Sequence, residues 1–267
     1  MIATVALSNW DLLAVAALLL VNAGVSVAFQ LGLGRRLLIG AVRATIQLAF
    51  LGLVLQWVFD QNQLGIVVTL MIAMGLVAGW EAVRRTTRRA PGMLPAAMTI
   101  MVTTSFGVTA YALIAVSDGT PWWSPRYAIP IMGMVLGNAL NGVSLGLETA
   151  LAGFDEQRDR VEALLALGAT RRQASRDVVR RAVRTGLVPI LNSMVAVGII
   201  AIPGMMTGQI LGGEDPADAA RYQLFILFTI AGGVALGTTG VVLTASRLLF
   251  DERDRLRLDR LRRIKDD

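Results

Sequence analysis

The stretch LGIVVTLMIAMGLVAGWEAVRRTTRR, residues 64–89, joins an apolar run at residues 64–82 to four arginines between residues 84 and 89. An α-helix needs roughly 20 predominantly apolar residues to cross the hydrocarbon core of a bilayer. The apolar run is long enough, and the arginines mark its end. This stretch therefore predicts a transmembrane helix with a basic end.

Six further apolar stretches are similar, at residues 10–30, 37–59, 96–117, 127–150, 186–211 and 222–246. Hydrophobic residues make up 55% of the chain and charged residues 16%, whereas about a quarter of the residues of a soluble domain are charged. The sequence thus predicts an all-α fold, a polytopic membrane helix bundle with about seven transmembrane helices. We expect residues 1–267 to form a single transmembrane domain.

The connections between these stretches alternate in charge. Acidic connections contain Asp60, Asp118 or the acidic residues at 214–218, and basic ones contain Arg35 and Arg36, the arginines at 84–89, residues 154–185 and the tail at 247–267. Lys and Arg near span ends stay on the cytoplasmic side of a membrane. We therefore expect an outside N-terminus, a cytoplasmic C-terminus and a multi-pass protein of the inner or plasma membrane.

The basic excess has a second consequence. With 25 Lys and Arg against 19 Asp and Glu, the net charge is +6. The basic loops fix topology and attract the anionic headgroups of membrane lipid. Because no aromatic residues are interleaved with them as a base-stacking platform, no nucleic-acid partner is expected. The basic tail at 247–267 is predicted to be an amphipathic helix near lipid or a charged extension of the last span.

Several classes of chemistry are excluded by residue type. The chain contains no cysteine and no histidine, so it has no disulfide, thiol nucleophile or imidazole base. A phosphate-binding loop G-x-x-x-x-G-K-[ST] is also absent, because Lys265 is the only lysine. We therefore expect no ATP hydrolysis by this chain alone and no enzyme activity.

The basic segment at residues 152–185 is too polar to cross a membrane, yet it has helical periodicity. Gly168 supplies a helix-ending or tight-turn position, and Thr170 can cap a second, basic helix. An apolar cluster precedes the turn, formed by Val161, Leu164, Leu165 and Leu167. This pattern predicts a helix–turn–helix element to which another molecule docks.

The same segment carries a resemblance to a known family. The pattern Glu162-Ala163-Leu164, three residues, then Gly168-Ala169 is similar to the cytoplasmic EAA-type element of ABC transporter permeases, which sits in a cleft of the ATPase subunit. Four longer stretches resemble the bacterial iron-export ABC permease family: residues 43–48, 129–138, 167–170 and 202–208 followed by Asp215-Pro216.

This resemblance implies a permease that pairs with a separate ATP-binding subunit, and a link to iron export and oxidative-stress tolerance. Plant relatives of the family are linked to aluminium tolerance. ATP and magnesium would be bound by the partner, and no cofactor by this chain. The coupling residues it implies are Glu162, Ala163, Leu167, Gly168, Ala169 and Thr170. Two copies of the chain are expected, because seven spans are few for a complete pathway.

Polar residues within the spans are candidates for a substrate pathway, since polar groups in hydrocarbon are costly. Arg43 and Gln47 share one helical face, although a snorkelling anchor and a packing hydrogen bond explain them equally well. Asn138, Asn141 and Glu148 are expected along one broad face of the fifth span. The alternative for this face is a tightly packed interface, which Gly142 and Gly146 would also permit. Glu148 is the best candidate for a metal ligand.

The sixth span contains Asn192 and is interrupted by Pro203-Gly204, so a kink or break is expected there. Met205 and Met206 beside the break offer thioether ligands, or else adaptable packing. Any metal route must use carboxylate, amide, backbone or thioether groups, because imidazole is absent. The acidic loop at 214–218 could attract cations, or simply be solvated.

Two other function classes stay open. A self-contained channel or secondary transporter for a small ion or solute would conduct through the polar faces alone, and inverted repeats would favour it. No convincing inverted repeat is found. A membrane enzyme would need clustered catalytic groups, for which the sequence offers no strong nucleophile motif.

Overall fold

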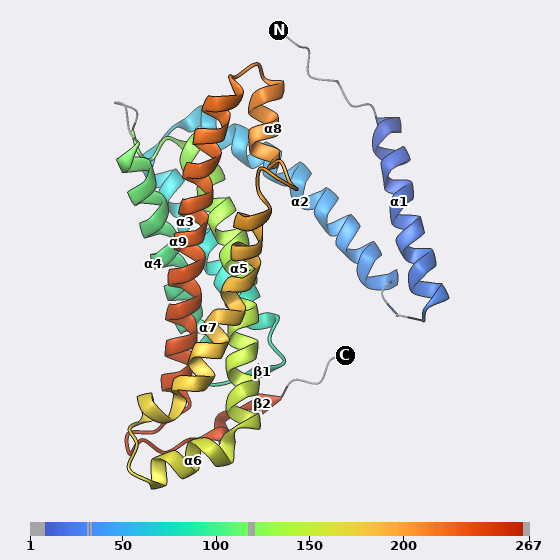
Figure 1. Ribbon diagram of the computed structural model, residues 1–267. Coiled ribbons are helices and arrows are strands. Elements are labelled where there is room, and N and C mark those ends of the chain that lie inside the picture. The colour runs from blue at the N-terminus through green and yellow to red at the C-terminus, as the bar shows by residue number, and fades with distance from the viewer. Residues whose placement is uncertain (1–8, 31, 33, 117–120, 264–267) are drawn as a thin grey trace.

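The computed structural model describes residues 9–30, 32, 34–116 and 121–263. Long helices lie side by side in one bundle, and a helical hairpin extends from it (Figure 1). The elements are α1 (Asn9–Ala28), α2 (Gly34–Gln61), α3 (Leu64–Arg84), β1 (Arg88–Arg89), α4 (Met93–Ala115), α5 (Pro125–Glu156), α6 (Arg158–Ala166), α7 (Arg171–Ala196), α8 (Gly204–Leu211), α9 (Pro216–Leu248), the 3₁₀ turn η1 (Leu258–Arg260) and β2 (Arg262–Arg263).

The predicted all-α membrane bundle is confirmed. Among the described residues, five helices are long and apolar enough to cross a membrane: Leu37–Gln61, Leu64–Arg84, Met93–Ala115, Pro125–Glu156 and Pro216–Leu248. The first predicted span corresponds to α1, whose apolar part, Ala14–Ala28, is shorter. The number of crossings and their orientation stay predictions, and Asp118 lies outside the described residues.

Helix α5 forms the centre of the bundle, because it packs against α3, α4, α7 and α9. Its buried face includes Met132, Leu147 and Phe154. A methyl group added at Gly142 would lie 2.8 Å from a Val234 methyl on α9 and 2.9 Å from the Gly186 carbonyl oxygen on α7. The predicted close helix approach at Gly142 is thereby confirmed. At this position α5, α7 and α9 pack closely against one another.

The predicted sixth span is divided in the structure. Helix α7 begins inside the basic segment and ends at Ala196, and α8 starts only at Gly204, with Pro203 as its N-cap residue. Gly198 in the connection has a φ of +81°, a conformation that favours glycine. A break is therefore confirmed, but it begins before the predicted Pro203-Gly204 position.

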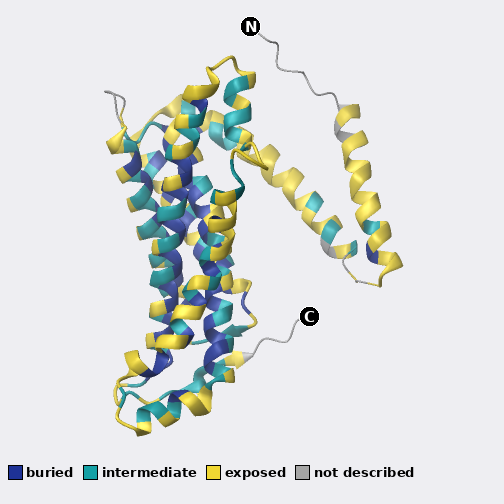
Figure 2. Cartoon of the chain, viewed as in Figure 1, coloured by how far each residue is buried: buried dark blue, intermediate teal, exposed yellow. Residues whose placement is uncertain are grey.

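The hairpin of α1 and α2 lies mostly outside the bundle, and its side chains are largely exposed (Figure 2). Only the C-terminal part of α2 joins the core, through Val54, Leu55 and the buried Val58. Apolar side chains such as Leu48 and Phe50 are 68% and 66% exposed. In a membrane protein such a surface is covered by lipid or by another subunit.

The tail after α9 differs from its prediction. Residues 250–263 form turns, η1 and β2 instead of an amphipathic helix or an extension of the last span. Strand β2 pairs antiparallel with β1, so that Arg88 lies opposite Arg263 and Arg89 opposite Arg262. Leu256, Leu258 and Leu261 pack against the core, and this apolar anchoring folds the tail back under the bundle.

Candidate coupling element and polar pathway

The turn between α6 and α7 has a defined hydrogen-bond pattern. The N–H of Ala169 donates to the Leu164 carbonyl at 3.0 Å, and the N–H of Gly168 donates to the Leu165 carbonyl at 3.0 Å. Gly168 has a φ of +89°. This is the Schellman pattern that ends a helix on a left-handed glycine, so the turn predicted at Gly168 is confirmed.

Helix α7 starts with a capping box. The Thr170 hydroxyl oxygen accepts the N–H of Gln173 at 3.4 Å, and the Gln173 side-chain oxygen accepts the N–H of Thr170 at 2.9 Å. Two of the four orphan donors of the helix start are thereby satisfied. The predicted cap at Thr170 is confirmed, and the turn is closed on both sides by backbone and side-chain bonds.

The two faces of this element differ in burial. Val161 is buried, and Leu164 and Leu165 pack against the core. Leu167, however, is 84% exposed, so its predicted place in the apolar cluster is wrong. The helix ends before Leu167 can turn inward, and its side chain stands at the tip of the turn.

The remaining candidate coupling residues lie around that tip. Ala163, Gly168 and Thr170 are exposed, and Ala169 is half-buried. The Glu162 carboxylate pairs with the Arg158 guanidinium at 2.9 Å on the same helix. The turn therefore presents small or apolar groups at its tip and a paired charge beside it.

The tail supports this element from the side. Asp254 lies 3.6 Å from the Arg171 guanidinium at the start of α7. The Asp251 carboxylate accepts the N–H groups of Arg253 and Arg255, both at 2.9 Å. The Arg255 N–H, together with the other donors, lowers the pKa of the Asp251 carboxyl below its ordinary value. An ionised Asp251 thus closes the turn that places Asp254 against α7.

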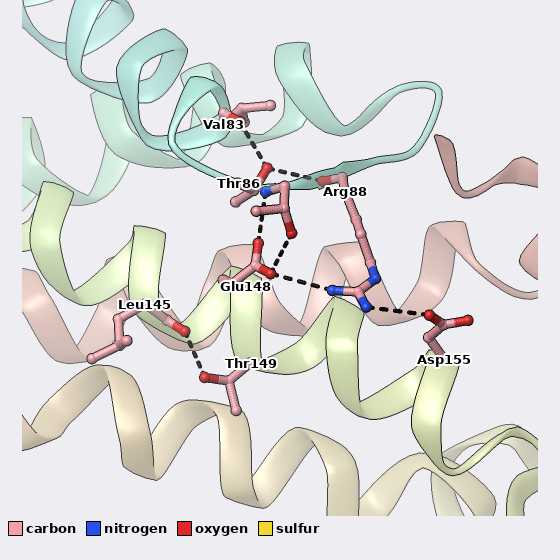
Figure 3. Close-up of polar contacts among 8 residues, drawn as sticks. Val83, Thr86, Arg88, Leu145, Glu148, Thr149 and Asp155 are labelled. Atoms are coloured by element: carbon pink, nitrogen blue, oxygen red, sulfur yellow. Dashed lines mark hydrogen bonds and ion pairs between the residues drawn. The ribbon is translucent and has the colours of Figure 1, made fainter. Parts of the chain in front are cut away.

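The Glu148 carboxylate on α5 is bound by the α3–α4 connection. One oxygen accepts the Thr87 N–H at 2.8 Å, and the other accepts the Thr87 hydroxyl at 2.6 Å and the Arg88 guanidinium at 3.3 Å. Arg88 also reaches Asp155, the last residue but one of α5, at 3.3 Å (Figure 3). This geometry supports the packing alternative for Glu148, and its role as a metal ligand stays a prediction.

The two asparagines of α5 have different surroundings. Asn141 accepts a hydrogen bond from Arg85 at 3.1 Å, and Arg85 also pairs with Glu81 at 3.4 Å. Asn138 is exposed and donates to the Met134 carbonyl of its own helix at 2.9 Å. The structure therefore brings Asn141 and Glu148 to the face covered by the end of α3 and its loop, but leaves Asn138 uncovered.

The other pathway candidates lie on separate elements. Arg43 and Gln47 are exposed on α2, where they line a shallow groove of about 450 Å³ along that helix. Asn192 is exposed on α7, and Met206 is half-buried on α8. The structure does not bring these residues together with the polar face of α5, so they form no single pathway in one copy of the chain.

Met205 belongs to a cleft at the α8 end of the bundle. This cleft of about 380 Å³ is also lined by Gln209, Tyr222, the acidic residues Glu214 and Asp218 and the basic residue Arg126. Asp218 pairs with Arg221 at 3.0 Å. Among the described residues, no group of three or more Asp or Glu side chains is placed to hold a metal ion.

Sequence reasoning missed the groups that bind Glu148. Thr87 and Arg88 lie about 60 positions before Glu148 and have no periodic relation to it. The available signal is the basic charge of the α3–α4 connection, which by itself indicates only the topology. Gln209 was missed because its place in the cleft depends on the break before α8.

Comparisons with known proteins identify the family. Residues 9–250 match the model described as Uncharacterised protein family (UPF0014). Rice UPF0014 membrane protein STAR2 (Oryza sativa subsp. japonica) is 36% identical over 82% of this chain and 76% of its own length. Arabidopsis thaliana Protein ALUMINUM SENSITIVE 3 is 34% identical over 84% of this chain and 81% of its own.

A bacterial relative is the Probable iron export permease protein FetB of Escherichia coli (strain K12), 30% identical over 88% of this chain and 89% of its own length. No solved structure matches the chain. The relatives' names describe membrane proteins and a permease, and the resemblance seen in the sequence motifs is confirmed. With a family match across residues 9–250, this chain is a multi-pass membrane protein of the UPF0014 family.

Proposed function

We propose that this chain is the permease subunit of an ATP-driven exporter, and that a separate ATPase subunit docks on the turn around Gly168. The observation that carries the proposal is a rigid turn with an exposed apolar tip. Schellman and capping-box bonds fix its backbone, while Leu167 at its tip is 84% exposed. An apolar side chain held out of the core on a braced turn suits insertion into a cleft of a partner.

The turn is mechanically connected to the membrane helices in two ways. Helix α6 follows α5 directly, with Gln157 between them, and α7 continues from the turn into the bundle. The tail joins the start of α7 to the α3–α4 connection through Asp254 and the β1–β2 pair. A displacement of the turn would therefore move α5 and α7 together. Such a joint movement is required if closure of the ATPase subunits is to reorient the pathway.

The proposed cargo is iron or another metal cation, by analogy with the name of the E. coli relative. At the α8 end, Glu214 and Asp218 with the Met205 thioether offer a weak, open set of donors. Such a set suits release better than tight retention, because one carboxylate is already paired with Arg221. Glu148 could serve as a ligand only after leaving Thr87 and Arg88. ATP and magnesium would be bound by the partner subunit.

A second copy of the chain completes the proposal. Arg43 and Gln47 are exposed on α2 within the stretch Leu37–Gln61, which is apolar enough to cross a membrane. Polar and charged groups in hydrocarbon usually face another helix or water. A homodimer in which the α1–α2 hairpin contacts the second copy would cover these groups and enclose a pathway that one copy does not form.

Co-purification tests the proposal. The chain is co-expressed with each ABC-type ATP-binding protein of its source genome, and the complex is reconstituted in lipid vesicles with Mg²⁺ and ATP. We expect one stable complex whose ATP hydrolysis rises with Fe²⁺. Association without cation stimulation would refute the metal cargo but keep the ATPase partner. Absence of association with every such protein would refute the exporter in favour of a channel or secondary transporter.

A further inference from the structure

A basic groove runs between the first half of α7 and the last turns of α9. It has a volume of about 520 Å³ and is lined by five arginines, Arg171, Arg172, Arg176, Arg180 and Arg247. Its apolar part is formed by Val179, Leu243 and Phe250. Of these residues only Arg171 also takes part in the proposed coupling element, through its pairing with Asp254.

Among the described residues, little negative charge balances the arginines of the groove. Arg171 pairs with Asp254 at 3.6 Å. In the part of the chain that the structure describes, the other four arginines of the groove form no ion pair. Arg172, Arg176 and Arg180 follow one another at four-residue intervals on one helical face, where like charges repel. An anion in the groove would relieve this repulsion.

The groove lies where a membrane helix leaves the hydrocarbon. Arg247 is in the last turn of α9, which is long and apolar enough to cross a membrane. Leu243 lies one turn deeper on the same helix and is 41% exposed. The groove is therefore basic at the headgroup level and apolar on the side that continues into the bilayer.

We propose that this groove binds an anionic phospholipid. The phosphate lies between Arg172, Arg176 and Arg247, and an acyl chain follows Leu243 into the membrane. A basic pocket between membrane helices on the cytoplasmic side is the surface that recognises anionic headgroups. A free inorganic anion would gain nothing from the apolar wall, and a docked acidic protein would have to enter the headgroup region to reach Leu243.

Lipid binding can be measured by native mass spectrometry of the detergent-purified full chain. The protein is titrated with phosphatidylglycerol, with phosphatidylcholine of the same acyl chains, and with inorganic phosphate. We expect the dissociation constant of phosphatidylglycerol to be lower than that of phosphatidylcholine by about tenfold or more, because each arginine near the headgroup favours negative charge. Equal binding of the two lipids, or occupancy by inorganic phosphate at the same concentration, would overturn the proposal.

Variants locate the site. R172Q/R176Q should weaken phosphatidylglycerol binding by about tenfold or more, because both removed charges contact the headgroup. R181Q/R253Q removes the same charge from exposed positions outside the groove and should change binding by less than about twofold. R247Q, on α9, repeats the test if the double variant on α7 fails to fold. Equal loss in the groove and control variants would refute the site, whether or not an ATPase partner is found.

Discussion

At the scale of single residues, Gly168 is the position where backbone conformation limits the choice of side chain. Its φ is +89°, and a methyl group added there would meet no atom within 4 Å. A substitution therefore acts through the backbone alone. Most residues disfavour this region, by about 1–3 kcal/mol, whereas asparagine tolerates it better.

We expect Gly168→Val to shift the turn and uncouple the two activities of the reconstituted complex: ATP hydrolysis continues while transport falls. Gly168→Asn is the matched control, because it adds a side chain without requiring a new backbone conformation, and it should keep most of the transport. Vesicle transport and ATP hydrolysis are measured in parallel. Equal transport by the valine and asparagine variants would show that the turn geometry is unimportant.

Glu148 has surroundings in the fold that differ from those its sequence position predicts. The sequence offers it as a carboxylate in a span, which favours a metal ligand, but both of its oxygens accept bonds from the α3–α4 connection. We expect Glu148→Gln to destabilise the purified protein by roughly 1–3 kcal/mol, because hydrogen bonds to a charged group are lost.

Thermal unfolding in detergent measures this effect, with Glu156→Gln on the same helix as the control. Glu156 is exposed, so its neutralisation should leave the unfolding midpoint nearly unchanged. If Glu148→Gln abolished cation-stimulated ATP hydrolysis at an unchanged midpoint, the carboxylate would be a ligand and the packing interpretation would be wrong.

The Asp251 carboxyl makes the tail sensitive to acid. Because its pKa is lowered in the folded tail, its contribution to tail stability is present above the ordinary carboxyl pKa and is lost as pH falls through the lowered value. We expect the tail amides around Arg253 and Arg255 to keep their protection from hydrogen exchange between about pH 8 and 5, and to lose it below about pH 4. Asp251→Ala should remove the protection at every pH, because the N–H groups of Arg253 and Arg255 then lose the side-chain oxygen that accepts both of them. Unchanged protection in that variant would contradict the role given to Asp251.

At the scale of elements, glycine spacing on α5 predicted close packing without saying where it occurs. Gly133, Gly137, Gly142 and Gly146 all have the required spacing. At Gly142 and Gly146 an added methyl group would meet α7 and α9 at 3.3 Å or less, whereas at Gly137 it would meet nothing within 4 Å. Periodicity identifies a face made of small residues, but the neighbouring helices decide which part of it is used.

This difference gives a matched pair of variants. We expect Gly142→Ala to destabilise the bundle by about 1–3 kcal/mol, because the new methyl group overlaps Val234 and the Gly186 backbone. Gly137→Ala makes the same chemical change in open space and should be neutral or slightly stabilising. Thermal unfolding in detergent compares the two. A neutral Gly142→Ala would contradict the close approach of α5, α7 and α9.

The elements predicted best are those set by local chemistry. The length of the apolar runs predicted the membrane helices. Gly168 predicted where α6 ends, and Thr170 predicted where α7 begins. The tail was predicted wrongly because its conformation depends on β1, which lies more than 150 positions earlier in the chain. The Arg88–Glu148 ion pair was missed for the same reason, since side chains from distant loops meet only after the helices have packed.

At the scale of the whole molecule, the two ends of the bundle have different characters. The end with α6 carries the braced turn, the folded-back tail and the arginine groove. The end with α8 carries a break in the helix and a cleft lined by charged residues of both signs, Arg126, Glu214 and Asp218. The α1–α2 hairpin extends from this body with a largely exposed surface (Figure 2), to which large hydrophobic side chains such as Leu48 and Phe50 belong. This division suits a subunit that is contacted by an ATPase at one end and by lipid or a second subunit along its membrane-facing surface.

Site-specific cross-linking tests the docking turn most directly, because the chain contains no cysteine. Single cysteines are placed at Leu167 and, as the control, at Ile199 between α7 and α8; these residues are 84% and 89% exposed. Each variant is treated with a cysteine cross-linker in the complex with its ATPase subunit. We predict a covalent adduct with the ATPase from position 167 and none from position 199. Adducts of equal yield from both positions, or none from position 167 in an intact complex, would contradict the assignment of the Gly168 turn as the coupling site.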